Sequence, residues 1–426
     1  MAPKRPLGIG KAAKAKKQKK ESTENESVGE TAASNELTVE LDEEIEANDA
    51  VAQLKALWKT YFASEDKSEL MLNGIIHECD RILRKTHNTK EQDEDDEKIE
   101  LSGRFYAIYA LALSSLAFYH TEDLKKVNDF FAEAFDRIES GRKAFPDSVD
   151  LAFAEAKIMI SRIPLVEVSQ LLVDSRVGKE RSDVSKSLDA SLAKWEEAQK
   201  QAVAQNHFHH YNAENFDFLQ ALDDLLDMVD NFGQEIMEGE DSDAEEDEKP
   251  HVELDEGHPL FAIKLLDKYN LWWREQTIAF LDHLNKNIEN ASAKELPALA
   301  VLKRELCKRL GQSYLMEAEV PANVFTTLSY YSKDAKSLNG LTRVEAQKIS
   351  QDLFKRALTY LKQAQDEQEP ETWVNVAEAM ISLGNTYEID SKEQEETYKE
   401  AEAILVKANN ATNGKYEDIL ENLMQG

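Results

Sequence analysis

Hydrophobic side chains recur every three or four residues along most of the chain, which is the spacing of one face of an α-helix. They form one stripe from Val51 to Phe62, and the pattern repeats from Leu70 to Leu83. The same spacing predicts further helices over residues 104–120, 123–140, 148–162, 183–205, 211–236, 258–288, 296–318, 343–366, 371–388, 391–409 and 415–424. No convincing run of alternating strand residues competes with them, so the pattern predicts an all-α fold.

Glycine and proline mark some of the predicted helix ends. Gly141 is expected to stop the helix over 123–140, and Pro146 to close the connection that follows. Pro164 is expected to end the helix over 148–162. The chain has only 15 glycine and 9 proline residues, which argues against a β fold rich in turns.

A weak repeat pattern indicates how the helices pair. The motif Leu-Gly-x-x-Tyr, typical of the first helix of a tetratricopeptide unit, occurs at 310–314 and 383–387. Glycine lacks a Cβ atom and lets paired helices approach closely. The second-helix spacing follows each motif, as Phe354 and Ala357 across a long insert holding Pro321 and Gly340, and as Ala401, Leu405 and Ala408. No regular period survives, so the prediction is a degenerate tetratricopeptide-like helical-repeat array, with a generic helical bundle as the alternative.

Charge divides the chain into segments. Residues 1–20 hold eight Lys and Arg and no acid, and residues 21–50 hold eleven acids and no base. Eleven more acids lie from Glu238 to Glu256, and a shorter acidic insert spans 91–97. Segments of this composition are expected to be disordered or to form loops. The predicted organisation is a disordered tail (1–50), N-terminal helical repeats (51–236), an acidic loop (237–257) and C-terminal helical repeats (258–426).

The basic tail carries two clusters of positive charge separated by ten residues. This spacing suits an extended peptide in the two acidic pockets of an import receptor, so the tail is predicted to be a nuclear-import signal. A plain solvated basic tail is the alternative. The residues concerned are Lys4, Arg5, Lys16, Lys17, Lys19 and Lys20.

The overall charge of −32 restricts the partners of the helical part. A body this acidic repels phosphates, so binding of nucleic acid over a large face is not expected. The alternative interpretation of the charge is that glutamate simply coats long helices. The longest uncharged stretch, Phe105 to Tyr119, is shorter than the ~20 residues of a membrane span. The two cysteines, Cys79 and Cys307, exclude a disulfide framework and indicate an intracellular protein.

Ser242 is a candidate phosphorylation site. Acidic residues follow it at the first and third positions, Asp243 and Glu245, as in sites of the casein kinase 2 type. A solvated loop without modification is the alternative.

Motifs for catalysis are incomplete. Gly8–Lys11 resembles part of a phosphate-binding loop but lacks the upstream Gly and the following Ser or Thr. His77–Arg81 begins like a zinc-protease helix, but Arg81 replaces the second His and cannot bind zinc. Neither a Gly-x-Ser-x-Gly elbow nor the His-x-Asp of an iron-binding triad occurs. The chain is therefore predicted to be no enzyme, with no cofactor and no metal.

Two side-chain clusters need an interpretation. His207 and His210 could share a helix face, with Glu214 one turn past His210. With His209 they could bind a transition metal or sense pH near about 6.5, although a partly exposed helix start with aromatic packing is favoured. Trp272 and Trp273 point about 100° apart, so both are buried only if their helix is covered on two sides. Core burial is favoured over a partner-binding anchor. The same interpretation applies to Trp58 and Trp373.

Three segments together carry a family resemblance. They are Lys4–Lys11, Val51–Phe62 and Leu72–Arg84, which read KRPLGIGK, VAQLKALWKTYF and LNGIIHECDRILR. In these segments the chain strongly resembles the fungal enhancer-of-translation-termination family. That family includes a negative regulator of a prolyl-hydroxylase-like 2-oxoglutarate dioxygenase.

The resemblance implies a nuclear, non-enzymatic regulatory scaffold with a tetratricopeptide-like fold. The implied partners are the dioxygenase and, through the basic tail, an import receptor, and the implied role is in translation termination and transcription. No partner-binding residues are transferred, because no family motif fixes them. The alternative function is an RNA- or ribosome-associated factor that acts directly in translation termination through its basic tail.

Overall fold

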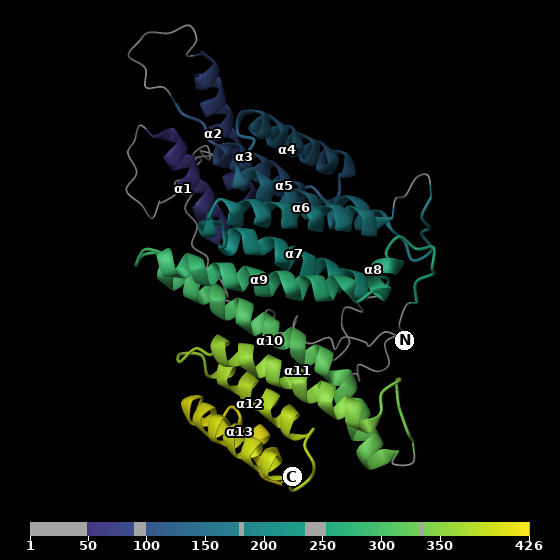
Figure 1. Ribbon diagram of the computed structural model, residues 1–426. Coiled ribbons are helices and arrows are strands. Elements are labelled where there is room, and N and C mark those ends of the chain that lie inside the picture. The colour runs from purple at the N-terminus through teal and green to yellow at the C-terminus, as the bar shows by residue number, and fades with distance from the viewer. Residues whose placement is uncertain (1–48, 89–98, 179–182, 235–252, 333–334, 426) are drawn as a thin grey trace, which may run out of the picture. The chain divides into compact units, whose positions relative to one another are not determined.

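The computed structural model describes residues 49–88, 99–178, 183–234, 253–332 and 335–425. Within these ranges the elements are helices, and strand-like pairing is limited to two isolated bridges, Leu338 with Leu341 and Asp366 with Glu369. The predicted all-α class is confirmed (Figure 1). The import-signal residues, Ser242, the acidic insert 91–97 and most of the predicted tail and acidic loop lie outside the described residues.

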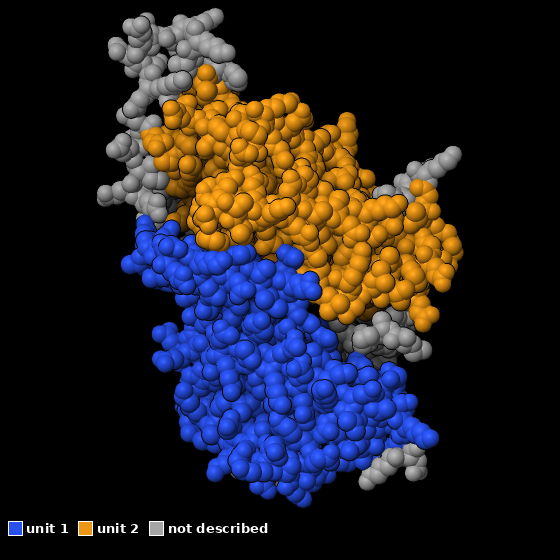
Figure 2. Space-filling view, in the orientation of Figure 1, with its two compact units in different colours: residues 1–29, 274–426 blue, residues 30–273 orange. Residues whose placement is uncertain are grey.

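The chain divides into two compact units, shown in different colours in Figure 2. Among the described residues, the N-terminal unit comprises those from 49 to 273 and the C-terminal unit those from 274 to 425. Helix α9 (Lys268–Asn290) contributes residues to both units. The division into N-terminal repeats (51–236), an acidic loop (237–257) and C-terminal repeats (258–426) remains a prediction.

The N-terminal unit is built around one helix, α3 (Gly103–Leu116), that is apolar along most of its length and charged only at Arg104 in its first turn. Its described elements are α1 (Ala50–Ala63), α2 (Glu69–Asn88), α3 (Gly103–Leu116), η1 (Ala117–Tyr119), α4 (Leu124–Ala144), α5 (Val149–Arg162), η2 (Ile163–Glu167), η3 (Val168–Gln170), α6 (Val184–Ala204), η4 (Phe208–His210), α7 (Ala213–Asp230) and α8 (Phe261–Leu265). Helix α3 is buried on nearly every side and packs against α2, α4 and α5. A helix that is apolar on nearly every side belongs inside a protein, as the uncharged stretch from Phe105 to Tyr119 predicts.

Gly141 does not stop α4, contrary to the prediction. The helix continues to Ala144, and its C-cap residue, Phe145, directly precedes Pro146. A Cβ atom at Gly141 would lie 2.7 Å from Cβ of Tyr106 and 2.9 Å from Cδ2 of Leu151. The absence of a Cβ atom at Gly141 therefore allows α4 to pack close to α3 and α5.

Three other predicted helices have different ends. The helix expected over 211–236 begins at Ala213 and ends at Asp230. The one expected over 258–288 is two helices, α8 and α9, because the chain turns to an extended conformation at Leu266. The one expected over 148–162 continues through Pro164 as the π-helical turn η2.

The C-terminal unit is a series of helices that pack in chain order. Its described elements, besides part of α9, are α10 (Leu296–Thr326), η6 (Thr327–Tyr331), α11 (Arg343–Ala364), α12 (Pro370–Gly384), α13 (Lys392–Ala411) and α14 (Glu417–Gln425). Each helix from α10 to α13 packs against the next (Figure 1). Pro321 was expected in a connection but lies inside α10, where buried neighbours such as Ala318 and Phe325 continue the apolar face. Their packing outweighs the ~3 kcal/mol that an internal proline costs.

Two glycines stand where paired helices approach closely, as the repeat motif predicts. A Cβ atom at Gly311 of α10 would lie 2.5 Å from Cγ of Leu361 in α11. One at Gly384 of α12 would overlap the ring of Tyr398 in α13. The predicted pairing of these helices is confirmed, and their assignment to the tetratricopeptide type stays a prediction.

Among the described residues, no helix has the length and apolar character that crossing a bilayer requires.

Candidate functional site

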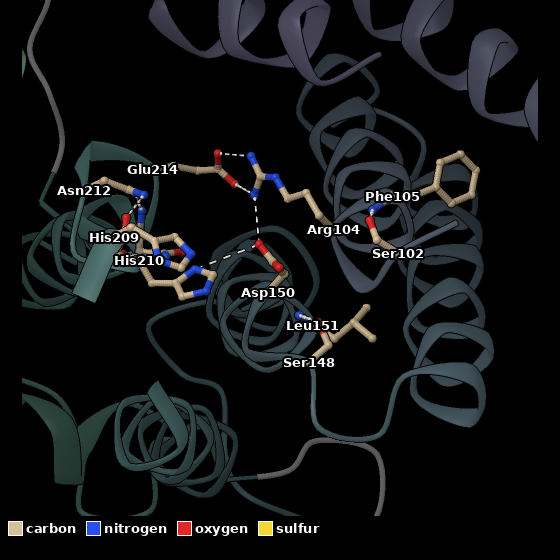
Figure 3. Close-up of polar contacts among 11 residues, drawn as sticks. Ser102, Arg104, Phe105, Ser148, Asp150, Leu151, His209, His210, Asn212 and Glu214 are labelled. Carbon is tan, nitrogen blue, oxygen red and sulfur yellow. Dashed lines mark hydrogen bonds and ion pairs between the residues drawn. The ribbon is translucent and has the colours of Figure 1, made fainter. Parts of the chain in front are cut away.

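Three charged residues from different parts of the N-terminal unit meet at helix starts (Figure 3). They are Arg104 in α3, Asp150 in α5 and Glu214 in α7. Each stands two positions after a residue whose side chain caps its helix, and the caps are Ser102, Ser148 and Asn212. Carboxylates in the first turn are favoured by the helix dipole, whereas a cation there is disfavoured. The two acids therefore compensate for the position of Arg104.

The guanidinium group of Arg104 binds Glu214 as a fork. Its Nη1 donates to Oε1 at 2.7 Å and its Nη2 donates to Oε2 at 2.6 Å. The Oδ1 atom of Asp150 lies 3.8 Å from Nη1. The side chain of Glu214 is only 14% exposed and that of Arg104 29%, so the pair is largely withdrawn from water. Parallel bonds of this kind are the strongest that arginine forms with a carboxylate.

The surroundings shift the pKa values of the two carboxyl groups, Glu214 and Asp150, in opposite directions. Burial raises the pKa of Glu214, but Arg104 and Lys157 together lower it more, so that the net shift is downward. Burial also raises the pKa of Asp150, and here Arg104 offsets it only in part, so the net shift is upward. Burial lowers the pKa of Arg104, and Glu214 reverses this shift. Arg104 and Glu214 therefore form the charged pair, and Asp150 interacts with Arg104 more weakly.

A second ion pair joins α5 to α7 beside the fork. The Nζ atom of Lys157 lies 2.8 Å from Oδ2 of Asp217 and 3.4 Å from the carbonyl oxygen of Glu214. The same ammonium group lies 5.1 Å from the centre of the Phe62 ring, a cation–π distance. Helices α1, α5 and α7 are thus linked by one lysine.

His210 lies beside the cluster as a neutral ring. Its side chain is 7% exposed, and its Nδ1 atom is 3.9 Å from Oδ1 of Asp150. Burial, with His209 and Arg104 nearby, lowers the pKa of His210 to about 3. A ring with this pKa stays neutral near pH 6.5, so His210 does not contribute to the pH sensing considered for the three histidines.

The histidine triplet is not arranged for a metal. His207 and His209 are exposed, whereas His210 is buried, so the helix face expected to be shared by His207 and His210 is not formed. Phe208–His210 form a 3-10 turn, and α7 begins only at Ala213. Across the described residues, no group of three or more His, Cys, Asp and Glu side chains could hold a metal ion. Packing explains the cluster, since the rings of His210 and Phe153 are 5.9 Å apart.

The cluster offers structural linkage and no reactive group. The hydroxyl groups of Ser102 and Ser148 accept capping bonds from their own helices. Both oxygens of Glu214 are occupied by Arg104. A nucleophile activated by a base would need a free partner within hydrogen-bond reach, and these groups provide none. The arrangement therefore holds the starts of α3, α5 and α7 together.

The other residues singled out from the sequence are mostly core residues. Trp58, Trp273 and Trp373 are buried, as predicted. Trp272 is half-buried and donates from Nε1 to Oε1 of Glu196 at 2.6 Å. His77 is exposed and Cys79 is buried.

Sequence reasoning missed the ionic cluster. Its members lie 46 and 64 residues apart along the chain, and nothing local predicts that they meet. One indication was present, since Arg104, Asp150 and Glu214 each follow a capping residue by two positions. That pattern places them at helix starts and does not say which starts adjoin.

Comparisons with known proteins give full-length matches. A family model described as "Nuclear pore complex subunit Nro1" matches residues 1–424. A protein of Debaryomyces hansenii named "Enhancer of translation termination 1" is 51% identical over 99% of this chain and 100% of its own length. One of the same name from Scheffersomyces stipitis is 52% identical over 99% of both chains.

A solved structure agrees in fold. The S. pombe nuclear import adaptor Nro1 aligns with a TM-score of 0.52 and 16% identity, over 91% of this chain and 100% of that one. At this identity the likeness shows the all-helical fold alone.

Proposed function

This chain belongs to the family described as the nuclear pore complex subunit Nro1, and on that premise we propose that it is a nuclear adaptor that binds partners. The nucleus is its compartment. The observation that carries the proposal is the family match over residues 1–424, which takes in both helical units and the basic tail. The names of its relatives, an import adaptor and an enhancer of translation termination, fit a regulatory protein.

The basic tail is the proposed contact with an import receptor. Lys4 and Arg5 form one cluster and Lys16–Lys20 the other. Their positive charge contrasts with the acidic remainder of the chain, so a receptor with acidic pockets is drawn to this end.

The proposed cargo is a 2-oxoglutarate dioxygenase of the prolyl-hydroxylase type. Support for this partner comes from the family resemblance in Lys4–Lys11, Val51–Phe62 and Leu72–Arg84. Influence on translation termination and on transcription would then follow from control of the dioxygenase. The chain itself is proposed to be non-enzymatic, in keeping with its incomplete catalytic motifs.

Affinity purification from the native cells tests the adaptor function. The full chain is compared with a variant that lacks residues 1–20 and with one in which Lys16, Lys17, Lys19 and Lys20 are alanine. The dioxygenase should be recovered in near-equal amounts with all three, while the import receptor and nuclear accumulation are lost with both variants. Failure to recover a dioxygenase would refute the proposed cargo.

A second candidate is a factor that acts directly on RNA or the ribosome. The relatives' name, "Enhancer of translation termination 1", favours it. It predicts that deletion of residues 1–20 abolishes ribosome association even when a foreign import signal restores nuclear entry. The acidity of the rest of the chain makes this the weaker candidate.

A further inference from the structure

His258 is a buried histidine that lies outside the ionic cluster and joins two segments of the N-terminal unit. It is 3% exposed, and its ring packs against that of Phe232 at a centroid distance of 5.3 Å. One segment, residues 253–260, contains the histidine and leads into α8. The other, residues 171–178, follows η3 and is called the tethered turn below. The contact between them spans 86 residues of the chain.

The hydrogen bonds of His258 require a neutral ring. Its Nδ1 atom accepts from the backbone N–H of Leu260 at 3.1 Å. A backbone N–H can only donate, so Nδ1 carries no proton and the proton of the ring is on Nε2. The Nε2 atom therefore donates to the carbonyl oxygen of Leu172, in the tethered turn, at 3.1 Å. A proton added to Nδ1 would place two donors against each other at Leu260.

Two further contacts hold the other end of the tethered turn. Val177 donates its backbone N–H to the carbonyl oxygen of Gly257 at 2.9 Å. Arg176 binds both carboxylate oxygens of Asp255 at 3.0 Å each. The side chains of this ion pair are 67% and 53% exposed, so the pair contributes little to stability on its own. The buried bond from the histidine is therefore the main contact that depends on a titratable group.

The charged groups in the described segments around His258 are mostly acidic. They are Asp174 and Arg176 of the tethered turn, Glu253, Asp255 and Glu256 before the histidine, and Asp227, Asp230 and Lys264 of α7 and α8. The next charged residues after the turn, Lys179, Glu180 and Arg181, lie outside the described residues.

His258 is the group among those described whose charge changes between about pH 5 and 7. The pKa of Asp255 is lowered by the N–H of Gly257 and by Arg176, so its carboxylate stays charged in that range. Six acids against two bases also favour a proton on the ring once the ring is released to water.

We propose that His258 is a proton-operated latch, which holds the tethered turn against residues 255–260 while its ring is neutral and releases the turn when the ring takes up a proton. The proton binds Nδ1, which then no longer accepts from Leu260. A histidine released to water has a pKa of about 6.5, so below that pH each unit of acidification favours the open turn by up to about tenfold. The proposal goes beyond the adaptor function, which stands on the family match and would survive its failure.

Hydrogen exchange of the full chain at pH 7 and pH 5, read by mass spectrometry, tests the proposal. Peptides that cover residues 171–178 report the backbone amides of the tethered turn, after correction for the intrinsic effect of pH on exchange. Their protection should fall at least about tenfold from pH 7 to pH 5. Peptides from the buried helix α3 should stay far more protected than the turn at both pH values, because the opening is local.

Three variants separate the latch from its surroundings. His258→Gln keeps an amide that can donate to Leu172 but does not titrate, so the protection of the turn should no longer depend on pH. Arg176→Gln removes the ion pair with Asp255 and should lower the protection equally at both pH values. His77→Gln, at an exposed histidine of α2, is the matched control and should behave as the natural chain.

Protection of the tethered turn that does not change with pH in the natural chain would overturn the proposal. So would a pH dependence that persists in His258→Gln, because another group would then control the turn. Equal protection of the turn and of α3 at pH 5 would also overturn it, since the whole N-terminal unit would then be opening.

Discussion

Arg104 and Glu214 are 110 residues apart in the chain, yet their side chains meet as a fork with two hydrogen bonds, of 2.7 and 2.6 Å. This contact joins the starts of α3 and α7 across the N-terminal unit (Figure 3). Since both side chains are largely removed from water, neither can lose its partner without leaving a poorly solvated charge.

Replacing Arg104 with leucine is expected to lower the free energy of unfolding by about 2–4 kcal/mol, because the largely buried carboxylate of Glu214 loses its charged partner. Lysine at the same position keeps the charge but cannot form both bonds, so its cost should be smaller. Urea unfolding followed by circular dichroism measures both. The exposed pair Lys143–Glu139 is the control, and Lys143→Leu should change little. Equal stability of Arg104→Leu and the natural chain would show that the fork contributes nothing.

The two classes of helical glycine should respond oppositely to alanine. Gly311→Ala places a Cβ atom 2.5 Å from Leu361 and should cost about 1–3 kcal/mol through overpacking. Gly74→Ala in α2 meets no atom within 4 Å and should stabilise the chain by up to about 1 kcal/mol, because alanine favours helices. Thermal unfolding of the two variants compares them directly. A stabilised Gly311→Ala would contradict the close approach of α10 and α11.

His210 should make stability depend on pH in mildly acidic solution. The pKa of His210 is lowered from 6.5 to about 3 on folding, so the unfolded chain binds the proton first as the pH falls. Stability from this residue is complete above the unfolded value and is lost as the pH falls toward the folded one. The variant His210→Phe should therefore show a shallower decline between these limits, by up to about 1.4 kcal/mol per pH unit. Chemical unfolding at a series of pH values tests this, and parallel curves for both chains would refute it.

Both cysteine thiols should be unreactive in the folded chain. Cys79 and Cys307 are buried, and burial raises the pKa of each thiol, that of Cys307 to about 11. The reactive thiolate is therefore scarce and inaccessible. A colorimetric disulfide reagent at mildly alkaline pH should label neither thiol in native conditions and both in denaturant. Rapid labelling of the native chain would show that one of them is accessible.

Most helices could be predicted because helix formation depends on residues that are close together in the sequence. The spacing of apolar residues and the capping residues act within a few positions, so the prediction 183–205 differs little from α6 and 343–366 little from α11. The role of the glycine in the Leu-Gly motif could also be predicted, because the missing Cβ atom lets paired helices approach closely.

The candidate site and several helix ends were decided by contacts between distant segments. Gly141 lies inside a helix because Tyr106 and Leu151 lie against it, and Pro321 is carried inside α10 by the packing around it. No local pattern says that Arg104 faces Glu214, or that residues 171–178 are fixed to 255–258. Periodicity and caps therefore determined that this chain is helical and where most helices begin. Only the folded structure decided which charges pair and which apolar side chains stay exposed, because those outcomes depend on which surfaces come together.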